Sequence, residues 1–284
     1  FKQKTAYEIG VRLVGSEMCI RDSILDISSS NYISEPMIVG GVPRDIYLNK
    51  ITKTDIDLTT NDADSPRLGI SAAMQLKLGF KMFEDGHVSV YSEDKAFDFS
   101  GNFISEKATE FARSEYGVKD KGLFEVYSRD FTINTMHKKL LNHELIDITG
   151  LAVRDLENKV VKTITVPDIC FEDDLRRVFR AINFAARLGF SIDGNIVDYA
   201  KNNIDVFSRE MGRTLRDAFV TSIIGESISK DAEKTLWYLV DMGILSLIPL
   251  TGVFKDELIK RKMVAKYLDD SITLNDKSLR DAYI

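Results

Sequence analysis

The spacing of apolar and polar residues divides the chain into a strand-rich first part and a helical second part. A short apolar run at 37–41 and an alternation of polar and apolar residues at 55–60 predict two strands. Residues 86–92 and 95–100 predict two more strands, joined by a turn around Glu93–Asp94. Together these segments predict a small mixed sheet.

Helices are predicted where apolar residues recur every three or four positions. Residues 24–34 are predicted to be the end of a helix, and Pro43 suits the first turn of a helix that ends at Leu48. Helical spacing over 66–78 predicts another helix beside the sheet. Residues 103–122 are polar and weakly patterned, so we expect a long loop there.

The second part of the chain is predicted to be almost entirely helical. Residues 131–136 are expected to start a helix, and residues 138–148 are typical of a hairpin that turns at Asn142–His143. Residues 173–190 predict one long helix, and the helical pattern then continues with little interruption. A sheet followed by an all-helical part is an α+β arrangement.

The first 23 residues do not have the pattern of a targeting sequence. Glu8 and Arg12 interrupt the only apolar centre, and the acidic residues are too many for a transit peptide. The stretch resembles the conceptual translation of a transposase-type sequencing-library adapter. We therefore interpret residues 1–23 as an assembly artefact that makes few contacts with the strand-rich first part of the chain, and expect native sequence from Ile24. Cys170 is then the only native cysteine.

Composition excludes several classes of protein. The chain has 284 residues, of which 44% are hydrophobic and 29% charged, as in ordinary globular proteins. Two cysteines and three histidines argue against a disulfide framework and against a Cys/His zinc site. The low cysteine count indicates a reducing compartment, and no segment approaches the roughly 20 apolar residues of a membrane span, so we expect a cytoplasmic protein. The net charge of −6 does not exclude nucleic acid, because a local basic face is sufficient.

The residues with the clearest chemistry lie in the predicted sheet. Gly40 and Gly41 follow a strand and open a helix, an arrangement that lets the backbone approach a phosphate closely. Arg44, one helical turn further on, can add a phosphate contact. Asp55 and Asp57, two apart on a strand, point to one face, where a divalent cation relieves their repulsion. Alone, each motif is most often a turn or a solvated edge, but their order and spacing favour metal-dependent nucleotidyl transfer.

These motifs resemble those of a known family. GGVPRD and DIDLTT together resemble the nucleotidyltransferase core of class II tRNA CCA-adding enzymes and the related bacterial poly(A) polymerases. Residues 128–136, SRDFTINTM, resemble the second motif of that family, and residues 173–190 resemble its nucleotide-selecting motif and the helix that follows. The resemblance covers residues 36–250 and several motifs in order.

The resemblance implies a division of the chain into domains. Residues 24–148 would form a nucleotidyltransferase head, and residues 149–208 a neck that carries the nucleotide-selecting helix. Residues 209–284 would form part of a helical body that binds RNA, because members of the family continue with further helices.

The resemblance also implies roles for individual residues. Asp55 and Asp57 match the catalytic metal-binding pair, and Asp98 lies where related enzymes place a third acidic residue, although an exposed strand residue is an equal alternative. The residues that match nucleotide contacts of the family are Gly41, Arg44, Arg129, Asp130, Asp174, Arg177 and Arg180.

Two of these residues suggest how the incoming base is chosen. Asp174 and Arg177 match the Asp and Arg that hydrogen-bond the edge of the base, and we expect them three apart on one helix face, as an acceptor and a forked donor. Arg180 extends the row and suits phosphate. A solvated face of an amphipathic helix is the alternative for both arginines.

The sequence departs from the family pattern at four places. Asp173-Asp174-Leu175 stands where Glu-Asp-Pro is usual, Asn183 where another Arg is usual, and Ser128 where the first Arg of Arg-Arg-Asp is usual. Residues 103–122 lack the basic pattern of the family. These departures concern the affinity for the nucleotide and the choice between CTP and ATP, whereas the metal-binding pair Asp55 and Asp57 is intact.

The resemblance implies an Mg²⁺-dependent enzyme that adds CCA to the 3′ end of tRNA from CTP and ATP, without a nucleic-acid template. A poly(A) polymerase, and an enzyme that adds only CC or only A, remain alternatives. A non-catalytic RNA-binding relative would have a broken metal pair, and a small-molecule nucleotidyltransferase would not need the second motif. The sequence indicates no membrane partner and no stable protein partner.

Overall fold

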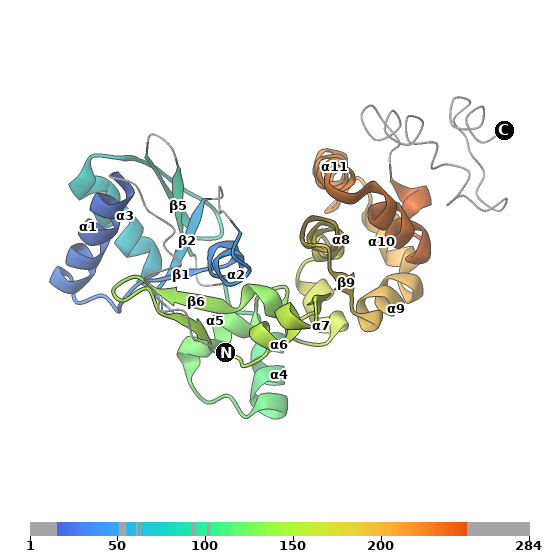
Figure 1. Ribbon diagram of the computed structural model, residues 1–284, viewed down its shortest axis with the longest axis horizontal. Coiled ribbons are helices and arrows are strands. Elements are labelled where there is room, and N and C mark those ends of the chain that lie inside the picture. Colours follow the sequence, from blue (N-terminus) through green and yellow to red (C-terminus); the bar gives the residue numbers. More distant parts are fainter. Residues whose placement is uncertain are drawn as a thin grey trace. The chain divides into compact units, whose positions relative to one another are not determined.

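The computed structural model divides the chain into two compact units, Phe1–Leu156 and Glu157–Ile284 (Figure 1). The division lies inside the segment expected to be the neck, and the domain boundaries at 148 and 208 stay predictions. The structure describes residues 16–50, 55–60, 62, 64–92, 95–100 and 103–248.

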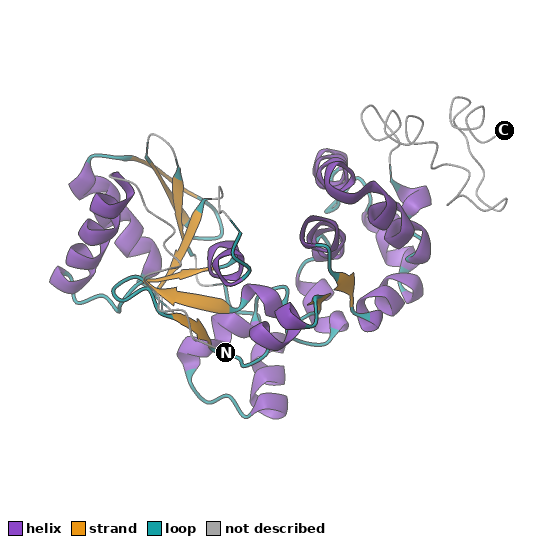
Figure 2. Ribbon diagram, in the orientation of Figure 1, coloured by secondary structure: helices purple, strands orange, loops and turns teal. Residues whose placement is uncertain are grey.

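A mixed sheet of seven strands forms the centre of the first unit (Figure 2). Its order is β3-β4-β5-β2-β1-β6-β7, and among the described strand pairs of this sheet only β2 and β5 are parallel. The strands are β1 (Met37–Val39), β2 (Ile56–Thr59), β3 (Gly79–Met82), β4 (Val88–Tyr91), β5 (Ala96–Phe99), β6 (Met136–Lys139) and β7 (Leu145–Asp147).

Two helices, α1 (Ser16–Ser30) and α3 (Ser65–Leu76), contribute side chains to the core of this unit, together with Val42 and Ile46. Leu58 and Phe99, each 1% exposed, belong to the same core as residues of both helices. Side chains alternate along a strand, so Asp57 and Asp98 point to the opposite face of the sheet. The remaining helices of this part are α2 (Gly41–Tyr47), α4 (Glu106–Tyr116), α5 (Phe124–Tyr127) and α6 (Ala152–Glu157).

The predicted strands and most of the predicted helices of the first unit are confirmed. Strands β1, β2, β4 and β5, the β6–β7 hairpin and helices α2 and α3 lie where the pattern placed them. The edge strand β3 was not predicted, because all four of its residues are exposed and no alternation marks it.

Two predictions in this unit are wrong. Residues 103–122 contain helix α4, which buries only three small side chains and therefore shows little apolar periodicity. Its ends carried the missed signal: the Ser105 side chain accepts from the Ala108 N–H at 3.2 Å, and Gly117 has φ 65°. Residues 131–136 form a short 3₁₀ helix, Thr132–Asn134, and then enter β6.

Helix α1 begins inside the segment that resembles an adapter. Ile20 packs against the core, and Arg21 Nη1 lies 2.6 Å from His143 Nε2. The expectation of few contacts is therefore wrong for this part of the segment, whereas residues 1–15 lie outside the described residues. The adapter interpretation itself stays a prediction.

Over residues 157–248, the part that the structure describes, the second unit is helical apart from one short parallel pair of strands, β8 (Val160–Val161) and β9 (Ser191–Ile192). Helix α11 packs along α8, whose inward face is apolar over most of its length. The described helices are α7 (Pro167–Asp173), α8 (Arg177–Leu188), α9 (Gly194–Asn202), α10 (Ile204–Glu210) and α11 (Asp217–Asp241). The α+β expectation is confirmed.

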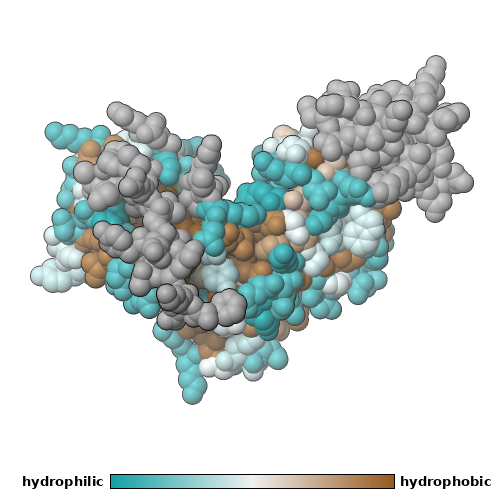
Figure 3. All heavy atoms as spheres, in the orientation of Figure 1, coloured by the Kyte–Doolittle hydropathy of each residue, from teal (hydrophilic) through white to brown (hydrophobic). Residues whose placement is uncertain are grey.

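Helix α11 bends at Asp231, which has φ −150° and ψ 92°. The Asp231 carboxylate accepts a hydrogen bond from the Lys234 N–H at 3.0 Å, so it caps the second half of the helix. No helix in the described part of the chain is long and apolar enough to cross a membrane. On the face shown in Figure 3, hydrophilic residues alternate with smaller hydrophobic areas.

Candidate active site

Two carboxylates lie side by side in the centre of the sheet. Asp57 on β2 is in register with Val39 on β1 and with Asp98 on the parallel strand β5. Neighbours in register point to the same face, so the two carboxylates share one surface. The buried Ser89 on β4 donates a hydrogen bond to Asp98, which fixes the orientation of that carboxylate.

Asp55 lies immediately before β2, two residues from Asp57. The alternation of a strand favours one face for both side chains, although Asp55 itself precedes the strand. It is exposed, and its Oδ1 accepts from the Ala96 N–H on β5 at 3.1 Å. The structure therefore places Asp57 and Asp98 in register on one face of the sheet and holds the Asp55 carboxylate against the backbone of β5.

The set of oxygen donors fits a divalent cation of the Mg²⁺ type. Mg²⁺ is usually held by one or two protein carboxylates, and substrate phosphates and water complete its shell. Asp55 and Asp57 are the carboxylates that could serve in this chain. Among the described residues, no group of three His, Cys, Asp or Glu side chains is placed to hold a metal alone.

Gly40 provides the space beside Asp57. Its φ of 72° and ψ of −128° are available almost only to glycine. A Cβ atom at this position would lie 2.5 Å from Asp57 Oδ2, far inside a normal contact distance. Both the conformation and the carboxylate therefore require glycine here.

Arg44 is buried and links the first motif to the second. Its side chain is 1% exposed, its Nε donates to Asp45 Oδ1 at 2.8 Å, and its Nη1 donates to Asn134 Oδ1 at 2.7 Å. The Asn134 amide then donates to Asp130 Oδ1 at 2.9 Å. Gly41, the first residue of α2, lies above this guanidinium, since a Cβ on it would be 3.3 Å from Arg44 Nη2. Arg44 thus forms a buried ion pair with Asp45, and its hydrogen bond to Asn134 joins the two motifs.

Arg129 belongs to a second buried group of polar residues. Its Nη2 donates to Glu125 Oε1 at 2.8 Å, one helical turn earlier, and both side chains are at most 15% exposed. His137 on β6 is fully buried, and burial together with the charge of Arg129 lowers its pKa to about 3. Glu125 and His137 were not predicted from the sequence, although the spacing of four residues between Glu125 and Arg129 was a signal for Glu125.

Ser128 replaces the first Arg of the family motif with a structural contact. Its hydroxyl donates to the Phe124 carbonyl at 2.8 Å and accepts from the Ser105 N–H at 2.9 Å. Ser105 is the N-cap of α4, so Ser128 ties the start of that helix to the second motif.

In the second unit, Asp174 and Arg177 do not share a helix face, which corrects the sequence prediction. Helix α7 ends at Asp173 and α8 begins at Arg177, and Asp174 between them is extended, with φ −159°. The Asp174 carboxylate accepts from the Arg176 N–H at 3.0 Å and from Arg176 Nε at 2.8 Å. This local pairing, typical of Asp, competes with the helix and interrupts it.

Arg177, Arg180 and Asn183 lie on α8. Arg177 Nη1 donates to the Cys170 carbonyl at 3.2 Å, and the exposed Arg180 lies 5.7 Å from the centre of the Phe184 ring. Asn183 is buried and donates to Ser227 Oγ on α11 at 3.2 Å. Asn183 therefore joins the two helices instead of facing a ligand.

The mixed sheet and its paired carboxylates beside a glycine turn resemble a nucleotidyltransferase head. Residues 36–162 match the poly A polymerase head domain family. The CCA-adding enzyme of Lactobacillus johnsonii is 24% identical over 230 residues, which are 79% of this chain and 53% of that protein. The CC-adding tRNA nucleotidyltransferase of Halalkalibacterium halodurans is 25% identical over 237 residues, 82% of this chain and 55% of that protein.

Solved structures show the same fold. The Thermotoga maritima CCA-adding enzyme complexed with tRNA has a TM-score of 0.66 at 19% identity, covering 98% of this chain and 68% of that chain. A complex of a CCA-adding enzyme with ATP also has a TM-score of 0.66, at 20% identity, covering 97% and 67%. Residues 36–162 thus match the head domain of poly(A) polymerases, and the chain is similar over most of its length to CCA-adding enzymes. It spans about half the length of the curated relatives it matches.

Proposed function

We propose that this chain is a tRNA nucleotidyltransferase that adds CCA to the tRNA 3′ end from CTP and ATP, without a nucleic-acid template. The observation that carries this proposal is the row of carboxylates, Asp57 in register with Asp98 and next to Asp55, beside the space left by Gly40. The names of the relatives support the choice of tRNA and of these nucleotides. Such an enzyme would act in the cytoplasm.

Asp55 and Asp57 would hold the Mg²⁺, with Asp98 oriented beside them by Ser89. When bound, the metal would lower the pKa of the attacking 3′-hydroxyl and neutralise charge on the triphosphate. Gly40 keeps the edge of the Asp57 carboxylate accessible, because any larger residue would fill that space. No side-chain base is needed in this arrangement.

The nucleotide would be bound by residues of both motifs and of α8. Gly41 and the buried charge of Arg44 would favour the triphosphate, and Arg129 and Asp130 would orient the ribose and phosphates. Arg180 would contribute a further phosphate contact from the surface of α8.

Base choice would depend on Asp174 and Arg177, as an acceptor and a donor for the base edge. The Asp174 carboxylate already accepts three hydrogen bonds from Arg176, one from its N–H and two from its guanidinium. Recognition of a base therefore requires the side-chain part of this pair to open. Arg176→Ala would free Asp174, and its effect on the ratio of CTP to ATP use measures this step.

Addition of CC alone is the second candidate function. The Halalkalibacterium halodurans relative, named a CC-adding enzyme, is as similar to this chain as the CCA-adding relatives are. Poly(A) synthesis is the third candidate, because the matching family is that of the poly A polymerase head domain.

One assay separates these activities. The purified chain is incubated with Mg²⁺ and tRNA that lacks its 3′ CCA, with CTP alone, ATP alone or both. Addition of three nucleotides that requires both supports the proposal, whereas a stop after two with CTP indicates CC addition. Long tails from ATP alone indicate a poly(A) polymerase, and the absence of any incorporation by folded protein refutes catalysis by this chain.

Matched variants test the carboxylates in the same assay. Asp55→Asn and Asp57→Asn keep the size of the side chain and remove its charge, so both should abolish transfer without unfolding the protein. Asp85→Asn is the control, because Asp85 is a 67% exposed carboxylate on the β3–β4 turn. Substantial transfer by Asp57→Asn would contradict the assignment of the pair.

A further inference from the structure

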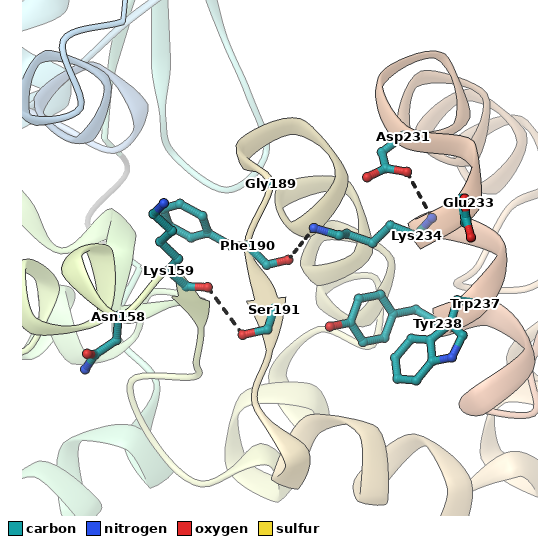
Figure 4. A pocket seen from close by; sticks show the side chains of 10 residues that line it. All are labelled: Asn158, Lys159, Gly189, Phe190, Ser191, Asp231, Glu233, Lys234, Trp237 and Tyr238. Carbon is teal, nitrogen blue, oxygen red and sulfur yellow. Dashed lines mark hydrogen bonds between the residues drawn. The ribbon is translucent and has the colours of Figure 1, made fainter.

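The second unit contains a pocket that is separate from the residues proposed for nucleotidyl transfer, because none of them lines it. It has a volume of about 640 Å³, within the range of ligand-binding clefts. Its walls come from the turn before β8, from the link between α8 and β9, and from α11 beyond its bend (Figure 4).

The pocket exposes the only tryptophan of the chain. Trp237 is 49% exposed, and its indole packs edge-on against Tyr238, with ring centres 4.7 Å apart and planes at 77°. Tyr238 is itself fixed, because it is 6% exposed and its hydroxyl accepts from the Ile192 N–H at 2.7 Å. Trp237 is therefore an accessible aromatic ring on a rigid support.

The other walls of the pocket are also held in place. Lys234 Nζ donates to the Phe190 carbonyl at 3.2 Å, which ties α11 to the segment before β9. Lys159 has a positive φ of 54°, an unfavourable conformation for a residue with a side chain, and its carbonyl accepts from the Ser191 N–H at 2.9 Å. Such a preformed cavity loses little conformational freedom when a ligand binds.

The polar atoms of the pocket favour a neutral ligand with both donors and acceptors. Two lysines are balanced by two acids, Asp231 and Glu233, so the pocket has no excess charge to attract a free phosphate. The side chains of Asn158, Lys159 and Trp237 have no hydrogen-bond partner among the described residues. They are therefore available to a ligand.

We propose that this pocket binds a nucleobase, stacked on the indole of Trp237. Figure 4 shows Asn158 and Lys159 on one side of the pocket and Trp237 on the other, so a base on the indole would direct its edge toward polar side chains. Stacking on an aromatic ring tolerates all four bases. The expectation that the base belongs to an unpaired RNA nucleotide rests on the proposed function. The proposal that the pocket binds a nucleobase rests only on the side chains that line it.

Fluorescence of the single tryptophan tests the proposal on the complete chain. The protein is titrated with AMP and CMP, with ribose 5-phosphate as a control that lacks the base, and with single-stranded and double-stranded RNA. Saturable quenching by the nucleotides, and none by ribose 5-phosphate, is expected. Tighter binding of single-stranded RNA than of the mononucleotides identifies RNA as the source of the base, and equal or weaker binding identifies free nucleotide.

Variants separate this pocket from the proposed reaction. Arg177→Ala and Asp57→Asn change residues of the proposed reaction and leave the pocket intact, so nucleotides should still quench the Trp237 fluorescence of both variants. The pocket can therefore be tested even if the chain does not catalyse nucleotidyl transfer. In a fluorescence-anisotropy assay with labelled single-stranded RNA, Trp237→Ala should weaken binding about tenfold or more, and Trp237→Phe much less. Lys159→Ala should weaken binding too, with Lys162→Ala as the matched control.

Circular dichroism verifies that these surface variants fold. The proposal is overturned if no nucleotide changes the fluorescence, if ribose 5-phosphate quenches equally, or if folded Trp237→Ala binds the RNA as well as the unmodified chain does. If the pocket instead binds a protein partner, no nucleotide should change the fluorescence.

Discussion

Gly40→Ala is the most direct test of how the backbone shapes the candidate active site. The Gly40 conformation, φ 72° and ψ −128°, costs a residue with a side chain about 1–3 kcal/mol. The new methyl group would also lie 2.5 Å from Asp57 Oδ2, so the carboxylate or the strand must move. A displacement of about 1 Å in a reacting group can reduce the rate roughly 100-fold.

Gly117→Ala provides the matched control. Gly117 also has a positive φ, 65°, but a Cβ atom there would meet nothing within 4 Å. Its substitution should cost about 1–2 kcal/mol and leave transfer unchanged. The comparison therefore separates backbone strain, common to both variants, from the contact with Asp57, which only Gly40→Ala disturbs.

Two measurements complete this test. Urea unfolding gives the loss of stability, and nucleotide incorporation into tRNA gives the loss of rate at equal concentrations of folded protein. Calorimetric titration with Mn²⁺ reports on the same carboxylates without requiring turnover. If Gly40→Ala retained transfer and metal binding within a few-fold of the unmodified chain, the reasoning about the space beside Asp57 would be wrong.

Three further predictions concern buried polar side chains. The pKa of His137 is lowered to about 3, so the unfolded chain binds the extra proton below pH 6.5 and stability falls as the pH drops from there toward 3. Between pH 7 and pH 5 this loss is about 2 kcal/mol, and urea unfolding should show that His137→Leu removes it. Asn134→Ala deprives Arg44 and Asp130 of partners and should cost about 2–4 kcal/mol in urea unfolding; an unchanged midpoint would contradict the buried network. Asn183→Arg, which restores the residue usual in the family, places a charge in a buried position and should lower the thermal midpoint seen by circular dichroism.

The elements that carry the carboxylates could be predicted from the sequence because they follow a local rule. Strands β2 and β5 have one buried and one accessible face, so Leu58 and Asp57 alternate, and the alternation is visible in the sequence. The shared face of Asp55 and Asp57 follows from the same rule. Their proximity to Asp98 depends on strand order, which the pattern alone does not determine.

The features that the sequence did not reveal depend on distant partners or on local competition. Arg44 is typical of an accessible phosphate contact, but its partner Asn134 lies 90 residues away and holds it in the interior. Asp174 has a strong helical context, yet its carboxylate binds the neighbouring Arg176 and ends the helix. Helix α4 buries too few apolar side chains to show a period, although both of its caps are visible in the sequence.

The place of β1 in the sheet has a consequence for folding during synthesis. One edge of β1 pairs with β2 soon after it leaves the ribosome, but the other edge pairs with β6, about 100 residues later. Until Lys139 has emerged, a nascent chain therefore presents an unpaired strand edge in the middle of its future sheet. We expect translation products that stop between residues 100 and 136 to aggregate, and longer products to become soluble once the β6–β7 hairpin can close that edge.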